Sequence, residues 1–404
     1  MKRAQSYQAQ KLLTYLGAYG VLTVFGLLIL FPFMFMFFTS FKAPGDIFRS
    51  PPRLLPFSAE LTTVDGAPAP LYRVETAEGV RTLALVDEGA PLVVFASVDD
   101  PGQTFERAPR DARPVGGFTA QEEVTVGGEV KKLWEIEEGG QTVQVVELRR
   151  GRQGVFADPA NPAATVEASL SEAAPVERVE FQTANYQRVL ELQNLDRSLT
   201  NTMLVTILVV LGQVLTSILG GYAFARLRFP GRDSLFVVYL GTIMIPFVVL
   251  IIPMYQLMVI VGWVDRMAAL VLPWIFTAYG TFLMRQFFIS IPKDLEEAAL
   301  MDGASRLRIL WQIFVPLAGP AIATQATFTF LYAWNSFVWP LIVINTGNFG
   351  NQVLTLSLMV LQGRAADSPN LVMAGTTIAV AVPLLIFVLA QRYFVEGIAT
   401  SGIK

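Results

Sequence analysis

Apolar residues gather into long uncharged stretches along this chain. Such stretches approach or exceed the roughly 20 residues that a helix needs to cross the hydrocarbon core of a membrane. Five of them cover residues 12–41, 198–225, 234–264, 267–284 and 368–391. One further span, together with an extracytoplasmic segment, is expected between residues 309 and 363. The pattern predicts an all-α polytopic membrane protein with six transmembrane helices.

Residues 57–181, between the first two predicted spans, show a different pattern. Short strand-like runs cover 71–75, 81–86, 91–98, 124–126, 130–136 and 142–148. Gly127-Gly128 and Gly139-Gly140 are expected to form hairpin turns. This segment carries 22 acidic and 11 basic residues, whereas the rest of the chain is net basic. It is predicted to be a β-rich domain outside the membrane, which either docks an extracytoplasmic partner or is a solvated elaboration that adds stability or nothing visible.

Basic residues predict the orientation of the spans. The segment before the first span carries Lys2, Arg3 and Lys11. It therefore belongs in the cytoplasm by the positive-inside rule, and that span is too long for a cleaved signal peptide. With six spans, both termini are expected in the cytoplasm. Three residues just beyond the first span run against this orientation: Lys42, Arg49 and Arg53.

Composition removes several classes of function. The chain is 53% hydrophobic and 16% charged, and it contains no Cys and no His. Thiol nucleophiles, disulfides, His-dependent triads and Cys- or His-based metal sites are therefore excluded. No Lys follows a Gly, so the chain has no phosphate-binding loop of the Gly-Lys-Ser/Thr type. The predicted spans lack acidic residues, which leaves an intramembrane enzyme without acid–base groups.

The predicted cytoplasmic segment 290–320 has the signals of two short helices joined by a turn. Pro292 suits the first helical position, where its missing N–H costs nothing. Acidic side chains at 294, 296 and 297 would then lie in the first turn, near the positive end of the helix dipole. Gly303 can adopt the positive φ that ends this helix. A second helix is expected from Ala304 to Phe314, and Ala298 and Ala299 leave one face flat enough for another protein.

The string itself is more specific than an amphipathic surface helix. Glu297-Ala298-Ala299, Asp302-Gly303-Ala304, Ile313 and Pro316 follow one another at spacings that resemble the coupling loop of permeases of ATP-binding-cassette importers. In that family the loop inserts into a groove of the ATPase subunit and transmits nucleotide-driven closure. The resemblance implies that the ATPase-coupling residues are Glu296, Glu297, Ala298, Ala299, Asp302, Gly303 and Ala304.

The resemblance extends to other segments of the chain. These are Asn185-Tyr186, Arg197 to Thr202, Gly221 to Arg226, Trp334-Asn335, Trp339 to Leu341 and the tail from Gln391 to Thr400. Together they resemble the six-span carbohydrate-importer permeases, the group that contains the second maltose permease subunit. The resemblance covers 1–56, a cytoplasmic tail with the first transmembrane helix, and 182–404, a five-helix core with a coupling loop at 290–316 and a C-terminal tail. The insert at 57–181 departs from it.

Partners and location follow from this resemblance. The chain is expected in the cell inner membrane as the transmembrane permease of a sugar or oligosaccharide importer of the type I kind. It would pair with a second, different permease, two ATPase subunits and an extracytoplasmic sugar-binding protein, with no nucleic acid. ATP and Mg would bind the ATPase subunits, and this chain would bind no cofactor. Thr400, Ser401 and Gly402 of the tail would also touch the ATPase pair, although a frayed terminus explains the tail equally well.

Polar and aromatic residues inside the spans are candidates for the substrate path. They are Tyr255, Gln256, Gln325, Tyr332, Trp334, Asn335 and Trp339, with Trp274 and Tyr279 in the same region. Aromatic faces bind sugar rings, and polar side chains within a span usually face a partner or a pathway. Pro246 and Pro253 are expected to interrupt the third span, and broken helices often line substrate cavities. As an alternative, the aromatic residues anchor the protein at the membrane interface and the amides bond neighbouring helices.

Two other functions stay open from the sequence. The same architecture could move a sugar phosphate or another small polar solute, because the predicted outer loops carry no decisive basic cluster. A membrane-anchored sensor, with the β-rich domain as its ligand-binding part, would need neither six spans nor a coupling loop.

Overall fold

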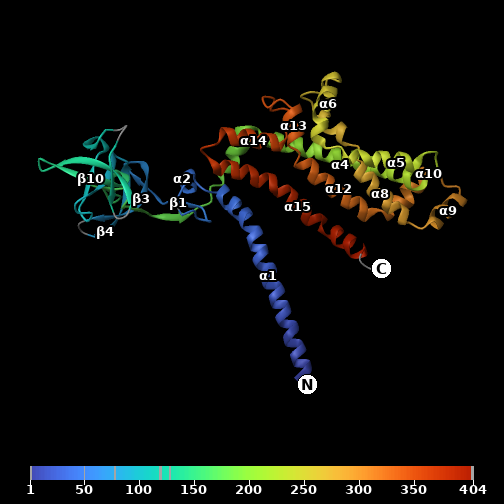
Figure 1. Cartoon of the computed structure of the whole chain (residues 1–404), viewed down its shortest axis with the longest axis horizontal. Helices are drawn as coiled ribbons and strands as arrows, with labels where there is room; N and C mark the ends of the chain where they lie inside the picture. The colour runs from blue at the N-terminus through green and yellow to red at the C-terminus, as the bar shows by residue number, and fades with distance from the viewer. Residues whose placement is uncertain (1, 50, 77–78, 118–120, 127–128, 402–404) are drawn as a thin grey trace. The chain divides into compact units, whose positions relative to one another are not determined.

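The chain divides into two compact units, Met1–Pro56 with Phe181–Lys404 and Phe57–Glu180 (Figure 1). The computed structural model describes residues 2–49, 51–76, 79–117, 121–126 and 129–401. The first unit is helical and the second is built of strands. A β-rich region set apart from a helical membrane region is therefore confirmed.

Helices of the first unit fall into long spans and short connecting pieces. Within the described residues, the helices long and apolar enough to cross a membrane are Lys11–Ser40, Leu195–Arg226, Ala268–Ser290 and Pro369–Gln391. They belong to α1 (Lys2–Ser40), to α4 (Leu195–Arg226), to α7 (Ala268–Val271) with η3 (Leu272–Trp274) and α8 (Ala278–Ser290), and to α15 (Pro369–Ser401). The shorter helices are α2 (Pro44–Ile47), α3 (Ala184–Gln193), α13 (Val338–Val343) and α14 (Leu354–Arg364).

Two further helix pairs pass the same test only when taken together. One is Arg232–Met244 with Phe247–Ile260, bent by 98°, and the other is Arg306–Leu317 with Gly319–Trp334, bent by 80°. The first pair comprises α5 (Arg232–Gly241), η2 (Thr242–Met244) and α6 (Phe247–Ile260). The second comprises α10 (Arg306–Ile309), η4 (Leu310–Phe314), α11 (Val315–Leu317) and α12 (Gly319–Trp334). The described residues thus hold four spans, or six if each bent pair counts as one.

Only one of the two prolines in the third predicted span breaks it. Pro246 stands in extended conformation immediately before α6, with φ −61° and ψ 131°. Pro253 lies inside α6 without ending it, so the expectation that both interrupt the span was wrong for Pro253. A proline within a membrane helix is tolerated when neighbouring groups satisfy the carbonyl that it leaves free.

Close packing of α4 against its neighbours forms the centre of the helical unit. A Cβ added at Gly221 of α4 would lie 2.6 Å from the Cβ of Met284 and 2.9 Å from the backbone nitrogen of Arg285 on α8. A Cβ added at Gly212 would lie 2.5 Å from Ile275. Small residues let membrane helices approach this closely. As a result α4 is held between α8 and α12.

Helix α1 is anchored near its C-terminal end. Its apolar span has a mean hydropathy of 2.6 and none of that 18-residue window is buried in the unit, as expected for a helix that faces lipid or another chain. At the other end, the side-chain amide of Asn185 donates to the carbonyls of Ser40 at 2.8 Å and Lys42 at 3.0 Å. The amide of Asn370 on α15 also donates to the Lys42 carbonyl, at 3.1 Å.

The β-rich unit is organised around one long strand, β10 (Gln141–Asp158). Its first half pairs with β9 (Glu129–Glu138) and β5 (Pro91–Ser97), and its second half pairs with β4 (Gly79–Asp87) and β11 (Asn161–Ser169). The other strands are β1 (Phe57–Ala59), β2 (Leu61–Val64), β3 (Ala67–Thr76), β6 (Thr104–Arg107), β7 (Ala112–Pro114), β8 (Glu123–Val126), β12 (Ala174–Pro175) and β13 (Glu177–Val179). Register shifts in its pairing with β4 and β5 bend β10, so that this one strand pairs with the strands in both halves of the unit.

The strands and turns predicted for the insert agree with the structure to different degrees. All six runs expected there lie on observed strands, but the last one continues to Asp158 instead of ending at 148. Gly139 and Gly140 form the β9–β10 turn with φ of 58° and 80°, as a two-residue hairpin of this kind requires. Gly127-Gly128 lies outside the described residues. Three apolar clusters, one around Phe95 and Ile136, one around Leu83 and Phe156 and a smaller one around Val64 and Ala84, form the core of the insert.

Candidate functional site

Residues 292–317, hereafter the 292–317 hairpin, follow α8 (Ala278–Ser290) and contain the segment singled out from the sequence. Its first helix, α9, runs from Lys293 to Met301. Pro292 precedes α9 with φ −55° and ψ 136° and so caps the helix instead of taking its first position. Asp294 and Glu296 lie in the first turn, whereas Glu297 falls just after it. The helix therefore begins one residue later than expected, because Pro292 has an extended backbone conformation.

Gly303 ends α9 as expected, with φ +76°. The Gly303 N–H donates to the Leu300 carbonyl at 3.0 Å, and the Ala304 N–H donates to the Ala299 carbonyl at 2.9 Å. This pair of bonds is the Schellman arrangement, which needs a residue with positive φ at the position of Gly303.

The second helix of the hairpin begins two residues later than expected. The hydroxyl of Ser305 accepts from the Arg308 N–H at 3.3 Å and caps α10 (Arg306–Ile309), so Ala304 stays outside the helix. The chain then passes through η4 (Leu310–Phe314), a short π-helix, and α11 (Val315–Leu317). A π-turn at this point widens the helix just before the 80° bend into α12.

The predicted coupling residues divide into an inward and an outward set. Glu296 is buried, and Ala299 and Ala304 are half-buried against an apolar cluster. The outward residues are exposed: Glu297, Ala298, Asp302 and Gly303. Ala298 and Ala299 therefore do not share one flat exposed face, because successive residues of a helix point about 100° apart.

The outer surface of the hairpin is apolar at its tip. Met301 is 88% exposed, and Leu295, Leu300 and Leu307 are also exposed. Beside them lies a depression lined by Ala299, Asp302, Ala304, Arg308, Ile309, Gln312 and Ile313. Exposed apolar side chains next to a depression are typical of a protein-binding surface. Sequence reasoning missed Met301, although an apolar residue beside a predicted turn was a usable signal.

Glu296 is buried because two arginines neutralise it. Its carboxylate forms an ion pair with Arg306 of α10 and lies 3.5 Å from Nη1 of Arg226, the last residue of α4. The side chains of Arg226 and Glu296 are only 5% and 10% exposed. A buried carboxylate of this kind needs both charge partners and hydrogen bonds to be tolerated. Arg226 is a functional candidate that the sequence reasoning used only as part of a motif and for topology.

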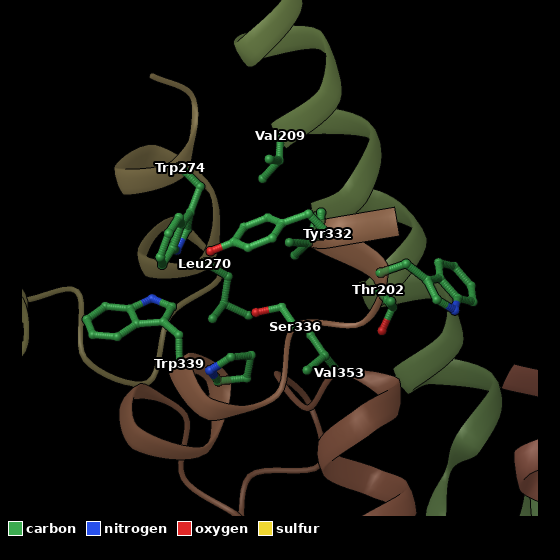
Figure 2. A pocket seen from close by; sticks show the side chains of 12 residues that line it. Thr202, Val209, Leu270, Trp274, Tyr332, Ser336, Trp339 and Val353 are labelled. Carbon is green, nitrogen blue, oxygen red and sulfur yellow. The ribbon is translucent and has the colours of Figure 1, made fainter. Parts of the chain in front are cut away.

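A small cavity of about 20 Å³ lies deeper in the helical unit, between α4, α12 and α13 (Figure 2). Aromatic rings form one side of it: Trp274 lies 5.7 Å from Tyr332 and 6.3 Å from Trp339 between ring centroids. Figure 2 shows the Tyr332 hydroxyl directed toward Trp274 and Leu270, while Thr202 and Ser336 lie on the other sides of the cavity. The size of this cavity is that of about one water molecule, so these aromatic and hydroxyl groups form a closely packed wall.

Trp334 and Trp339 border this cavity but belong to different parts of the core. The Trp339 indole donates to the Ala269 carbonyl at 2.9 Å and lies beside Phe247 and Trp274. The Trp334 indole donates to the Ala379 carbonyl on α15 at 3.1 Å and stacks on Phe330. Both indoles therefore have structural partners. They are not brought together as one cluster.

Gln325 is placed by the structure in a network that ties α12 to α4. Its amide donates to the hydroxyl of Ser217 at 2.6 Å, and the Thr329 hydroxyl donates to Oε1 of Gln213 at 2.8 Å. Gln213 in turn donates to the Trp274 carbonyl at 2.7 Å. The sequence reasoning missed Gln213, although a glutamine inside an uncharged apolar stretch was a signal that could have found it.

A second, larger cavity of about 840 Å³ lies beside this network. It is lined by the break between η2 and α6, by the Pro273–Gly280 segment and by α12, and Tyr332 borders both cavities. Trp274 and Tyr279 line it as well. The residues that line the two cavities include no charged side chain.

Three of the substrate-path candidates border neither cavity. Tyr255 and Gln256 lie on α6 away from both. Asn335 ends α12, and its amide donates to the Leu331 carbonyl at 2.8 Å. The tail candidates cannot be placed: Thr400 and Ser401 lie in α15 with side chains outside the described set, and Gly402 lies outside the described residues. Over the described part of the chain, no three Asp or Glu residues converge as a metal site would require.

Known proteins resemble the helical part of this chain. Residues 198–400 match the family described as binding-protein-dependent transport system inner membrane component. The sn-glycerol-3-phosphate transport system permease protein UgpE of Pectobacterium atrosepticum is 36% identical over 203 residues, which cover 50% of this chain and 72% of that protein. The arabinooligosaccharides transport system permease protein AraQ of Halalkalibacterium halodurans is 33% identical over 204 residues, with coverage of 50% and 72%.

The chain also resembles a solved structure, at lower sequence identity. That structure is a bacterial ABC transporter involved in the import of the acidic polysaccharide alginate, with a TM-score of 0.48 and 25% identity, over 55% of this chain and 81% of that one.

Proposed function

This chain belongs to the binding-protein-dependent transport system inner membrane components and is a permease subunit of an ATP-binding-cassette importer, and from that premise we propose that it forms half of the pathway for a sugar or oligosaccharide. It is a multi-pass membrane protein and a transport subunit, not a catalytic enzyme. The observation that supports the proposal is the 292–317 hairpin, whose tip exposes the apolar side chain of Met301.

Permeases of such importers work with ATPase subunits and a binding protein. For this chain we propose two ATPase subunits, which bind ATP and Mg, and a second permease of different sequence. The 292–317 hairpin would seat on one ATPase subunit through Glu297, Ala298, Asp302 and Gly303, with the tail residues Thr400, Ser401 and Gly402 nearby. This chain would bind no cofactor of its own.

The proposed topology has six spans, with each bent pair taken as one and both termini in the cytoplasm. The basic residues at 2, 3 and 11 support this orientation. It places the 292–317 hairpin in the cytoplasm and the β-rich unit outside, where a binding protein would deliver the solute. The insert would dock that protein or only add a solvated elaboration.

Transport would follow from closure of the ATPase subunits. ATP binding draws them together, the hairpin moves with them, and the paired permeases change from inward- to outward-facing. Each state is favoured only by the contacts that differ between the states. The aromatic side chains that line the second cavity, Trp274, Tyr279 and Tyr332, are the proposed contact for a sugar ring.

A chain that naturally lacks cysteine allows a direct test of the hairpin assignment. Met301→Cys, in the complex purified with its ATPase, is expected to form a cross-link to that subunit with a short bifunctional thiol–amine reagent. Val80→Cys is the matched control, because Val80 is also strongly exposed but lies on β4 of the insert. If no ATPase co-purifies, or if it reacts equally with both positions, the proposal is wrong.

A sugar phosphate is the second candidate solute, and the relationship to a glycerol phosphate permease favours it. Two cavities lined without a charged side chain favour a neutral sugar, since a phosphate buried without a cation is costly. Uptake of labelled neutral sugars and of labelled glycerol phosphate by proteoliposomes containing the full complex distinguishes the two.

A further inference from the structure

Arg226 contacts three successive segments of the chain from its position at the end of α4. Its guanidinium donates to the carbonyls of Phe288, at 2.7 Å, and Ile291. The Phe288 carbonyl also accepts from the Ile291 N–H at 3.3 Å, and Ile291 is the residue at which α8 ends. The arginine therefore adds hydrogen bonds to carbonyls at a helix terminus, where intrahelical partners are few. Arg226 thereby fixes the end of α8 to the end of α4.

The same guanidinium also holds the two helices of the 292–317 hairpin. Nη1 lies 3.5 Å from the carboxylate of Glu296 on α9, and the guanidinium carbon lies 5.0 Å from the ring centroid of Phe314. The pair is almost completely buried, so solvent does not weaken it as it would a surface ion pair. Arg306, by contrast, approaches Glu296 from within the hairpin and is half exposed.

Only an arginine fits this position. Its planar fork directs several N–H groups at once, whereas a lysine ammonium is a single point charge. One donor, Nε of Arg226, is buried without an acceptor in this conformation. A buried donor without an acceptor is unfavourable, and it leaves the guanidinium able to take up a new bond if the hairpin shifts.

Movement at Arg226 would reach the cavity walls. Helix α4 supplies Thr202, Val205 and Val209 to the first cavity and Gln213 to the second. The helix is continuous from Leu195 to Arg226 and packs closely against α8. A rigid helix transmits a displacement of its end along its length.

We propose that Arg226 and Glu296 are positioning residues that make α4 follow the 292–317 hairpin, so that ATP-driven motion reaches the cavities. This inference rests on the proposed function, because it assumes that an ATPase holds the hairpin. The inward face of α9 would then transmit the motion to α4, and the outward face of α9 would bind the ATPase subunit.

The test uses the reconstituted full complex and measures solute taken up per ATP hydrolysed. Arg226→Gln and Glu296→Gln are each expected to lower this ratio about tenfold while hydrolysis continues. Glu296→Gln keeps the arginine–carbonyl bonds at the end of α8, but it weakens the contacts of this side chain with both Arg226 and Arg306.

Arg285→Gln is the matched control. Arg285 also donates to a carbonyl of α4, that of Phe224 at 3.3 Å, and stacks on Phe236 at 4.2 Å, but neither contact involves the hairpin. In this variant the solute taken up per ATP hydrolysed is expected to stay at the wild-type value.

Different results would overturn this inference and the proposed function. An unchanged ratio in Arg226→Gln and Glu296→Gln overturns the inference, and so does loss of the ATPase subunit from both variant complexes, because the pair would then serve assembly alone. A wild-type complex without ATP hydrolysis would instead overturn the proposed function.

Discussion

Glu296 and Glu297 are neighbours in α9, yet the carboxylate of Glu296 is buried between two arginines and that of Glu297 is exposed to solvent. The helix places the two side chains on different faces. One face belongs to the packed unit and the other is free to meet another protein. This division allows the two acids to be tested separately.

Charge reversal at Glu297 is expected to impair ATPase contact without disturbing the fold. Because the side chain is exposed and outside the buried cluster, Glu297→Lys should leave membrane insertion intact and lower sugar uptake per ATP by about tenfold. The measurement is uptake and hydrolysis in proteoliposomes. Glu191→Lys, an exposed reversal on α3, is the control. Wild-type uptake per ATP in Glu297→Lys would contradict the coupling assignment.

Substitution of Gly303 is expected to loosen the hairpin. Gly303 has φ +76° and open space where a Cβ would stand, so Gly303→Ala costs only backbone strain, about 1 kcal/mol. Gly303→Pro costs more, since proline fixes φ near −65° and removes the N–H that bonds to Leu300. Amide hydrogen exchange in residues 292–317 should therefore be faster in Gly303→Ala than in wild type, and faster still in Gly303→Pro.

Gly319→Ala is the control for the hairpin, because Gly319 also has open space but lacks a positive φ. Equal exchange rates in the Gly303 and Gly319 variants would show that the turn does not depend on a left-handed residue.

Tyr332 is expected to matter for solute movement more than Tyr255. Tyr332 borders both cavities, and its ring lies 5.7 Å from that of Trp274. Tyr332→Ala should therefore slow uptake of the transported sugar severalfold, as loss of an aromatic contact does. Tyr255→Ala changes the same residue type on α6, away from both cavities, and should have little effect. The proposed path would be wrong if Tyr255→Ala were the slower variant.

The contact between α4 and α8 is expected to tolerate no side chain at Gly221. A Cβ there would approach Met284 and the backbone of Arg285 within 3 Å. Gly221→Ala should destabilise the protein by about 1–3 kcal/mol, the usual range for overpacking. The thermal midpoint of the protein in detergent measures this. Gly241→Ala, where nothing lies within 4 Å, should leave the midpoint close to wild type.

Several features could be predicted from the sequence because their causes are local. Uncharged stretches indicate membrane helices whatever their neighbours, since lipid excludes charge. Gly303 was recognisable because few residues tolerate its backbone conformation. The paired glycines at 139–140 marked a hairpin for the same reason.

Other features depend on packing between residues far apart in the chain. Pro246 breaks a helix and Pro253 does not, although both are prolines in one apolar stretch. Trp334 and Trp339 lie five positions apart, but one indole bonds α15 and the other bonds α7. Such partners are chosen by the tertiary arrangement, so local pattern cannot name them.

The sequence by itself determined where the membrane helices, the β-rich insert and the Gly303 turn lie, because hydrophobic length, alternation and glycine conformation act over short distances. Tertiary structure alone decided that Glu296 faces inward while Glu297 faces outward, and that Arg226, 70 positions before Glu296, closes the buried pair. Burial of a charge is favourable only when a partner from another element arrives at the right place, and that requires the folded bundle.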